Sequence, residues 1–410
     1  MRSGTGVRAG LYSVLSAVLL TLAAAFGSTG AASAAAPKGP IEIGVPLPMT
    51  GVLAESGANL LDGIKYATYQ VNKAGGIDGR KIELLIRDTQ GDPTVAAQVA
   101  TALITQSHVT AFVGGYGSTP DYAMFSAIEQ YNPLFMSVDT SSPQAEQLVS
   151  HANWFFHTYI WDPYREEALV SFLNTLRPKP KTVVVAHESG QYGTQGAQQV
   201  IPMLRKAGYQ VLANLSFTAG SPDFTPTLQQ VKALHPDVFY DIGYPSDDLL
   251  IAKQAAQQDI GAKLMVHVWA GESQSQFGKY AAGLVSIDVW NPAMKVPGMQ
   301  AWIKGYKAYI HQAPNGGAVQ GYAGAITLYD AMKMTRSLNE AKLISALSRN
   351  SFWTPFGILK YRAAPGGGMH QLLLPQNQVI YQYRGNTSVV VWPAKVANGK
   401  AQYPFNYYGK

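Results

Sequence analysis

Strand-like and helix-like patterns alternate along most of this chain, and this alternation restricts the possible folds more than any other feature. The first strand pattern, IEIGVPLP, begins at Ile41, and a helical pattern with apolar residues on one face follows it. Further strands are expected at 81–88, 111–113, 133–137, 154–157, 182–187, 210–216 and 238–241. Several of these strands are apolar on both faces and must be covered on both. The pattern therefore predicts an α/β fold with doubly wound parallel sheets.

Residues 72–93, NKAGGIDGRKIELLIRDTQGDP, hold one complete unit of this alternation. Gly75 and Gly76 are expected to end a helix, because the left-handed residue that follows many helices is usually glycine. Asp78 and Gly79 predict a tight turn into the strand KIELLIRD. Asp92 followed by a proline then predicts the start of the next helix, at 94–107.

The length of the chain predicts more than one core. It has 410 residues, and the alternation extends beyond the roughly 250–300 residues that one hydrophobic core serves. No linker rich in proline or serine divides it, so we expect two lobes that exchange strands through crossovers. Further helices are expected at 164–176, 196–206 and 247–258, and a C-terminal hairpin should turn at 384–386.

The first 36 residues predict a secretory signal peptide. Arg2 and Arg8 precede an apolar run from Leu11 to Phe26, and small residues with a cleavage pattern near 32–36 follow. The alternative is a membrane anchor, but the run is shorter than the roughly 20 residues that a spanning helix needs. We therefore expect an exported protein with the leader removed.

The sequence contains no cysteine, which excludes disulfides, thiolate metal sites and a cysteine nucleophile. A lipid anchor on a leader cysteine is excluded as well. We expect release into the periplasm. Without Arg2 and Arg8 the chain keeps 29 basic and 25 acidic residues, a net charge of +4 with no basic block, so no nucleic-acid partner is expected.

Sequence signals for an enzyme are weak. The chain has no G-x-S-x-G elbow, no H-E-x-x-H zinc helix and no G-x-x-x-x-G-K phosphate loop. His187 and Glu188 are adjacent near Ser189, but neighbours at a strand end usually point to opposite sides. The eight histidines show no metal-ligand spacing. We expect no catalytic residues, no metal site and no cofactor.

Six segments in register resemble the type I periplasmic binding proteins, in the branched-chain amino acid (Leu/Ile/Val) branch that serves ABC importers. The segments are IEIGVPLPMTG, GGIDGRKIELLIRDTQGDP, AFVGGYGS, PLFMSVDTSSPQ, VVVAHESGQYG and DVFYDIGY, within about residues 40–290. The resemblance implies two Rossmann-like lobes with a three-crossover hinge that close on a ligand. It places lobe one at 37–158 and 290–358, and lobe two at 159–289 and 359–410.

The resemblance also implies ligand contacts in lobe one, at the carboxyl ends of strands. Ser118, beside Thr119 at a helix start, matches a serine that holds the ligand carboxylate; the alternative is a helix cap. Asp139 and Ser141 match a carbonyl and a hydroxyl contact. The Asp139 carboxylate could meet a ligand ammonium or only cap a helix.

In lobe two the resemblance matches Tyr192 and Tyr244 to aromatic residues that cover the ligand. Without a gap, the position of the family's ammonium-binding acid falls at or beside Val268 or Trp269 and not on an acid, and a short gap would bring Glu272 to that place. If Trp269 faces the cleft instead, an aromatic or amide ligand is favoured, with two further aromatic residues near it, Tyr116 and Trp161.

We therefore expect an extracytoplasmic solute-binding protein that passes a small ligand to an inner-membrane ABC permease. The ligand is an amino acid, an amide or an aromatic acid. The alternative is a sensor of the same fold that binds an amide or an aromatic carboxylate and signals to a membrane receptor or kinase, because fold alone does not separate these roles.

Overall fold

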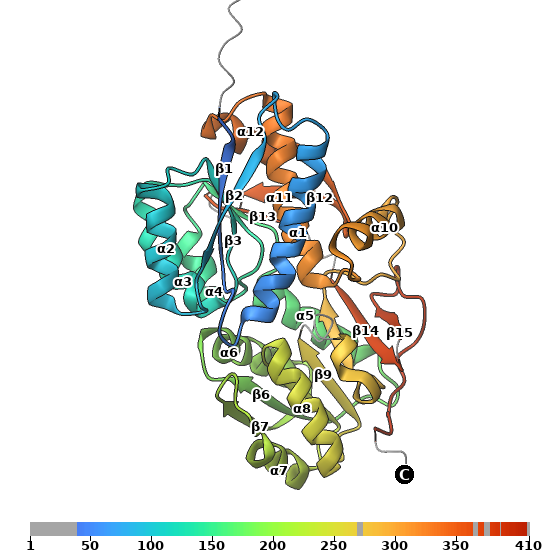
Figure 1. Cartoon of the computed structure of the whole chain (residues 1–410). Coiled ribbons are helices and arrows are strands. Elements are labelled where there is room, and N and C mark those ends of the chain that lie inside the picture. The colour runs from blue at the N-terminus through green and yellow to red at the C-terminus, as the bar shows by residue number, and fades with distance from the viewer. Residues whose placement is uncertain (1–38, 269–273, 364–367, 373–377, 386, 408–410) are drawn as a thin grey trace, which may run out of the picture. The chain divides into compact units, whose positions relative to one another are not determined.

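The computed structural model describes residues 39–268, 274–363, 368–372, 378–385 and 387–407, and from Pro40 onward they form one compact unit (Figure 1). The expected signal peptide lies outside the described residues. Two sheets with helices packed on them make up this unit, as the alternating pattern predicts.

The first sheet has eight strands in the order β11-β12-β13-β5-β4-β3-β1-β2. The strands from β13 to β2 are parallel, and β12 and β11 extend the sheet antiparallel. The strands are β1 Ile41–Leu47, β2 Ile82–Asp88, β3 Ala111–Gly114, β4 Phe135–Ser137, β5 Phe155–His157, β11 Ser351–Thr354, β12 Gly357–Ala363 and β13 His370–Leu372.

The second sheet has seven strands in the order β15-β14-β10-β9-β8-β6-β7. Strands β6 to β10 are parallel, and the hairpin β14–β15 is antiparallel, as expected for the C-terminal tail. The strands are β6 Thr182–Glu188, β7 Gln210–Phe217, β8 Val238–Ile242, β9 Leu264–Val268, β10 Val285–Asp288, β14 Val379–Arg384 and β15 Thr387–Trp392.

Helices follow most of the parallel strands. Those grouped with the first sheet are α1 Ala54–Lys73, α2 Pro93–Thr105, α3 Ser118–Ile128, α4 Pro143–Val149, α10 Met299–Ile310, α11 Gly316–Thr335 and α12 Glu340–Arg349 (Figure 1). Those grouped with the second sheet are α5 Asp162–Thr175, α6 Gln191–Lys206, α7 Thr225–Leu234, α8 Pro245–Gln258 and α9 Gln274–Phe277. Each sheet with its helices is a doubly wound lobe, and the same strand order, 2-1-3-4-5, recurs in both parallel parts.

The chain passes between the sheets three times: after β5, after β10, and between β13 and β14. The expected end of lobe one at residue 358 falls inside β12, and β12 and β13 both pair within the first sheet. We therefore place the last change of lobe between Leu372 and Val379. This pairing depends on contacts between distant strands, which the local pattern does not reveal.

The stretch 72–93 folds as its letters predict. Helix α1 ends at Lys73, and Gly75 and Gly76 take positive φ angles of 107° and 84°. Asp78 and Gly79 also take positive φ angles, in the turn before β2. The Asp92 side chain accepts the Val95 N–H at 2.9 Å and caps α2.

Helices α1 and α11 lie side by side and touch through their backbones (Figure 1). A Cβ atom added at Gly321 of α11 would lie 2.0 Å from the Leu60 carbonyl oxygen of α1. One added at Gly63 of α1 would lie 1.9 Å from the Ala318 carbonyl oxygen. The two helices reach this separation because each places a glycine against the other's backbone.

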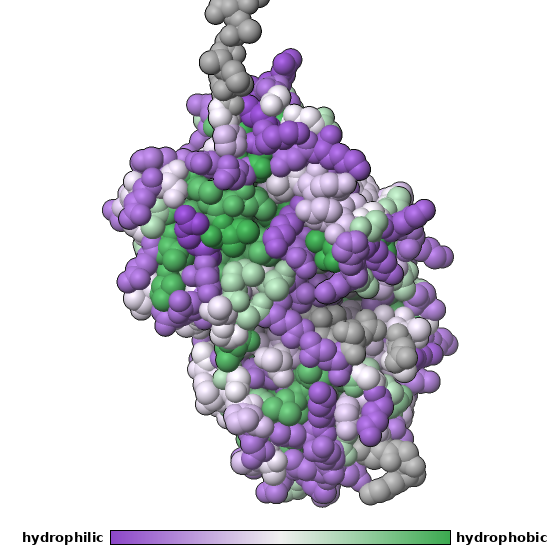
Figure 2. Space-filling model, in the orientation of Figure 1, coloured by the Kyte–Doolittle hydropathy of each residue, from purple (hydrophilic) through white to green (hydrophobic). Residues whose placement is uncertain are grey.

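Apolar side chains lie at the surface along β2, which is an edge strand of the first sheet. Leu84, Leu85 and Ile86 of β2 are half-buried. Figure 2 shows an apolar area where Figure 1 places β1 and β2. Within the described ranges, no helix combines the length and apolar character needed to cross a membrane.

We predict that Gly321→Ala lowers the free energy of unfolding by about 2–3 kcal/mol, because the added methyl group forces α11 away from α1. At an ordinary position inside a helix, the same change would raise the free energy of unfolding by about 1 kcal/mol. Chemical denaturation measures the difference.

The matched control is Gly305→Ala in α10. There the nearest atom to an added Cβ is the hydroxyl oxygen at the end of the Tyr66 side chain, at 2.2 Å, so no backbone has to move. Equal losses in the two variants would contradict the backbone contact.

Candidate ligand site at the strand ends

The loop after β4 carries the most constrained backbone near the predicted site. Thr140 has a φ angle of 81°, in the left-handed region that β-branched residues rarely adopt. Asp139 precedes it and Ser141 follows, and all three are buried. Strain of this kind persists only where the surroundings fix the conformation, which is common at binding sites.

Four side chains hold this loop in place. The Thr140 hydroxyl donates to the Asp121 carboxyl group of α3, and the Thr140 carbonyl oxygen lies 2.7 Å from Nε2 of His157. The Ser137 hydroxyl donates to the Asp139 carbonyl oxygen at 2.7 Å. Burial lowers the pKa of His157 to about 3, so the ring is neutral and Nε2 carries the proton that it donates. The fourth side chain is Ser118, which follows the neighbouring strand β3 and contacts the Ser141 and Ser142 amides.

Ser118 does not cap its own helix. The N-cap of α3 is Gly117, and Ser118 Oγ instead accepts long hydrogen bonds from the Ser141 and Ser142 amides, at 3.4 and 3.3 Å. Asp139 caps no helix either, because the N-cap of α4 is Ser142, whose hydroxyl accepts from Ala145. The capping alternatives thus do not explain these two side chains.

Three tyrosines from both lobes form an aromatic cluster beside this loop. The ring centroid of Tyr244 lies 5.3 Å from that of Tyr192 and 6.2 Å from that of Tyr116. All three side chains are buried. Tyr116 follows β3 of lobe one, whereas Tyr192 and Tyr244 follow β6 and β8 of lobe two. The structure thus brings these three predicted residues together.

A buried arginine lies under the cluster. The Arg165 guanidinium is 5.3 Å from the Tyr192 ring centroid, and its nitrogens approach Asp162 at 2.7 Å and Glu166 at 2.6 Å. Tyr240 of β8 donates to the Glu166 carboxylate at 2.9 Å. Sequence reasoning missed this group, because Asp162 and Arg165 have the i,i+3 spacing of an ordinary surface pair.

Two predicted residues present buried polar atoms that lack a hydrogen-bond partner within the described part of the chain. They are the Tyr192 hydroxyl and the Trp161 indole Nε1. Their side chains are 4% and 1% exposed. Trp161 stacks on His157 with ring centroids 3.8 Å apart. Buried donors of this kind are normally satisfied, so these atoms are available to a small polar ligand.

Neutral hydrogen bonds cross between the lobes at the same place. The Thr119 hydroxyl accepts from the Gln191 amide at 3.1 Å, and the Gln191 side chain donates to Ser142 at 3.2 Å. The side chains of Gln144 and Gln195 bond at 2.7 Å, and Gln195 also accepts the Gln144 amide at 3.0 Å. Thr119 therefore takes part in contact between the lobes.

Buried carboxyl groups surround the site. Burial raises the pKa of Asp139 to about 7 and that of Asp121 to about 8. It also raises the pKa of Asp288, at the end of β10, to about 7. The Asp288 carboxylate accepts the Val289 amide at 2.6 Å and lies against Gly316 at the start of α11. Asp288 was not predicted, although an acid that ends the apolar strand VSID is a usable signal.

Two predicted residues, Trp269 and Glu272, lie outside the described residues. The side chains of the adjacent pair His187 and Glu188 both contact backbone groups. His187 Nδ1 lies 2.7 Å from the Glu188 carbonyl oxygen, and the Glu188 carboxylate accepts the Gly190 and Gly193 amides at the start of α6.

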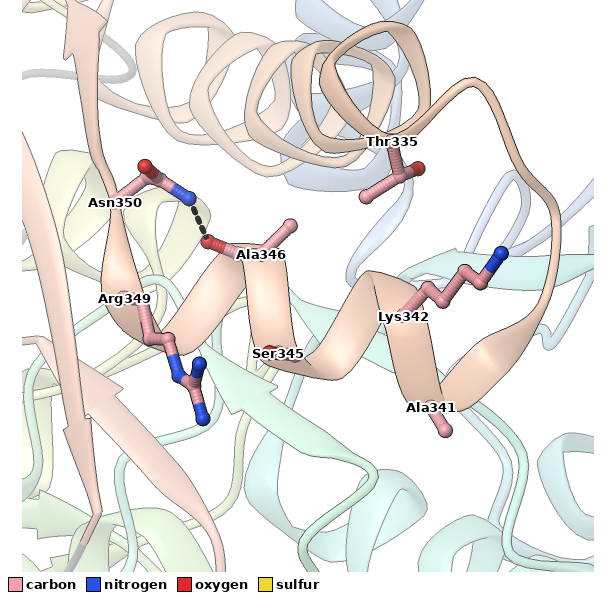
Figure 3. Close-up of a pocket in the computed structure, with 7 residues that line it drawn as sticks. All are labelled: Thr335, Ala341, Lys342, Ser345, Ala346, Arg349 and Asn350. Atoms are coloured by element: carbon pink, nitrogen blue, oxygen red, sulfur yellow. Dashed lines mark hydrogen bonds between the residues drawn. The ribbon is translucent and has the colours of Figure 1, made fainter.

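A separate surface hollow of about 480 Å³ lies between the end of α11 and α12 (Figure 3). It is lined by Thr335, Ala341, Lys342, Ser345, Ala346, Arg349 and Asn350. Helix α11 has 20 residues, so its two ends are about 30 Å apart. The hollow is at the end of α11 that is remote from Gly316 and Asp288, and it is not part of the candidate site.

We predict that the ligand-free protein loses stability as pH rises from about 5 to 8. The folded state keeps protons on Asp139 and Asp121 that the unfolded chain releases near their ordinary pKa of 3.8, so the free energy of unfolding must fall over this window. Asp139→Asn should flatten the decline by about 1.4 kcal/mol per pH unit between roughly pH 5 and 6.5.

Urea denaturation in half-unit pH steps measures this slope. Glu83→Gln, which removes an exposed carboxylate from β2, is the control and should keep the wild-type slope. Parallel curves for Asp139→Asn and the wild type would show that Asp139 is ionised in the folded protein.

Comparisons with known proteins agree with this architecture. The chain is 28% identical to the leucine-, isoleucine-, valine-, threonine- and alanine-binding protein of Pseudomonas aeruginosa over 347 residues. The aligned residues cover 84% of this chain and 91% of the relative. The leucine binding protein LivK of Thermotoga maritima superposes with a TM-score of 0.75 at 22% identity, over 86% of this chain and 98% of that one.

A solute binding protein of an ABC transporter from R. palustris, solved with benzoate, gives a TM-score of 0.76 at 18% identity, over 88% of this chain and 98% of that one. The family described as "Periplasmic binding protein" matches residues 40–378, which is most of the chain. With two doubly wound lobes and a buried polar site between their strand ends, this chain belongs to the periplasmic binding protein family.

Proposed function

We propose that this protein captures a small amino-acid-like ligand between its two lobes and delivers it to an inner-membrane ABC permease. Family membership implies an extracytoplasmic location. We extend this to export with removal of the leader and release without a lipid anchor. The relative from P. aeruginosa is named for aliphatic amino acids and threonine, which supports a ligand of this class.

The observation that carries the proposal is a pair of unsatisfied buried donors, one at the N-cap of α5 and one in the first turn of α6. The Tyr192 hydroxyl and Trp161 Nε1 lack a hydrogen-bond partner among the described residues, and Asp139 is buried nearby. The electrostatic influence of Arg165 reaches both Asp139 and Tyr192, which places all three groups in one neighbourhood. A zwitterionic ligand would offer acceptors to the donors and an ammonium to the carboxyl group.

In this proposal the ligand carboxylate binds first on lobe one. The Ser141 and Ser142 amides now point at Ser118 Oγ with long hydrogen bonds, and a carboxylate would accept stronger ones from the same amides and from the hydroxyl. Asp139 then binds the ammonium, which would return its carboxyl group to the charged form. Tyr192 and Tyr244 cover the ligand as the lobes close.

An aromatic carboxylate is the second candidate ligand. The structural neighbour from R. palustris was solved with benzoate, and aromatic side chains crowd this site too: Tyr116, Trp161, Tyr192 and Tyr244. Such a ligand would use the Ser118 side of the site and would not need Asp139.

Binding measurements on paired ligands separate the two candidates. We expect leucine or phenylalanine to bind the wild type, and Asp139→Asn to weaken that binding by about 10- to 100-fold through loss of a charged partner. The affinities of Asp139→Asn for the deaminated analogues and for benzoate should differ from those of the wild type by less than about 3-fold. Benzoate binding without any amino acid binding would establish the second candidate.

Ser118→Ala tests the carboxylate assignment, and we expect about 10-fold weaker binding of either ligand class. Ser189→Ala, at an exposed position beside the same cleft, is the control. Unchanged affinity in Ser118→Ala would contradict the assignment. Ligand released from the protein should be chemically intact, because we propose that it binds and does not convert its ligand.

A further inference from the structure

The outer edge of the first sheet is open along β2. This strand stands last in the strand order, and among the described strands it pairs only with β1. Leu84, Leu85 and Ile86 in its middle are half-buried, and Figure 2 shows an apolar area where Figure 1 places the strand. Exposed apolar surface along an edge strand favours pairing with a further strand. The outer edge of β2 is therefore a candidate interface.

The backbone groups that point outward from this edge belong to alternate residues. The Lys81 carbonyl oxygen, just before β2, accepts the first amide of β1 at 2.8 Å, so the odd-numbered residues face β1. Ile82 faces outward, and the Asn72 side chain of α1 bonds both its amide and its carbonyl oxygen at 2.8 Å. Asn72 closes this end of the edge. The next outward residues, Leu84 and Ile86, are the ones that a further strand would meet.

The sequence of β2 complements itself in the antiparallel direction. A two-fold axis through Leu85 places Leu84 opposite Ile86 of a second copy. The same axis places Glu83 opposite Arg87 of the second copy, and both of these side chains are exposed. Opposite charges directly across two antiparallel strands stabilise their pairing, whereas like charges destabilise it. The register also sets outward-pointing residues against each other, as a hydrogen-bonded antiparallel pair requires.

We propose that two copies of this protein form a dimer in which their β2 strands pair antiparallel about Leu85. Leu84 and Ile86 would then exchange backbone hydrogen bonds with the second copy, with a Glu83–Arg87 ion pair on each side of the apolar centre. The Arg87 guanidinium now donates to the Ile86 carbonyl oxygen at 3.0 Å, and a carboxylate is a stronger acceptor than this carbonyl. Because β2 belongs to lobe one alone, the dimer leaves lobe two free to move.

Sedimentation equilibrium of the full chain as exported, at low ionic strength, measures the dimer. We expect reversible association at about 10–100 μM, because an interface made mainly by one strand from each copy is small. Arg87→Glu should weaken the dimer by about 10-fold or more, since it turns both ion pairs into like-charge contacts. The double variant Glu83→Arg/Arg87→Glu should restore it. Lys342→Glu makes the same charge change at an exposed position of α12 and should keep the wild-type affinity.

A single introduced thiol tests the register, because the chain contains no cysteine. Leu85 lies on the axis and faces itself in a pair whose Cα atoms are about 4.5 Å apart, which a disulfide can span. Leu85→Cys should therefore give a covalent dimer on mild oxidation, and Ser189→Cys, at an exposed position of lobe two, should not.

Four results would overturn the proposal. They are a monomer at every concentration up to about 1 mM, a dimer that Arg87→Glu leaves unchanged, no recovery in the double variant, and equal cross-linking of the two cysteine variants.

Discussion

The buried guanidinium of Arg165 is the interaction on which the arrangement of the ligand site depends. It is the only buried arginine or lysine in the described ranges, and it contacts carboxylates from its own helix on two sides. Removing one partner of such a group leaves an uncompensated charge in a low-dielectric interior, which costs about 3–5 kcal/mol. Both carboxylates belong to α5 itself, so this helix carries the compensation for its own buried charge.

The same group links elements that come from different parts of the chain. Glu166, held by Arg165, accepts the Tyr240 hydroxyl of β8, and the Tyr192 ring of α6 lies over the guanidinium. Arg165 also opposes the effect of burial on the Asp139 carboxyl group of lobe one. Arg165 thus contacts the Tyr192 ring, holds the Glu166 carboxylate that binds Tyr240, and acts on the charge of Asp139 in the loop after β4.

The fold was predictable where the local sequence pattern favours the same element that tertiary packing requires. The apolar strand at 238–241 and the helix at 247–258 lie within one or two residues of β8 and α8. Helix α6 begins at Gln191 instead of the expected 196, because the Glu188 carboxylate caps it through the Gly190 and Gly193 amides. Helix α11 was not expected at all. Its glycines have low helix propensity, and packing against α1 overrides that preference.

Much of the candidate site was not predictable from the chain alone. Resemblance to a family indicated Ser118, Tyr192 and Tyr244, and the structure places them around one buried region. The left-handed Thr140 could not be foreseen, since its conformation depends on Asp121 and His157, which are 19 and 17 residues away. Sequence spacing carries no information about such contacts.

The polar bonds between the lobes have a kinetic consequence. The Thr119–Gln191 and Gln144–Gln195 contacts join the lobes without any ligand atom. A molecule that enters the buried region has to wait until these bonds part, so the frequency of opening sets an upper limit on its association rate. The same bonds delay escape. Residence time can therefore be lengthened or shortened at these glutamines, which touch the partner lobe and leave the chemistry of recognition to other side chains.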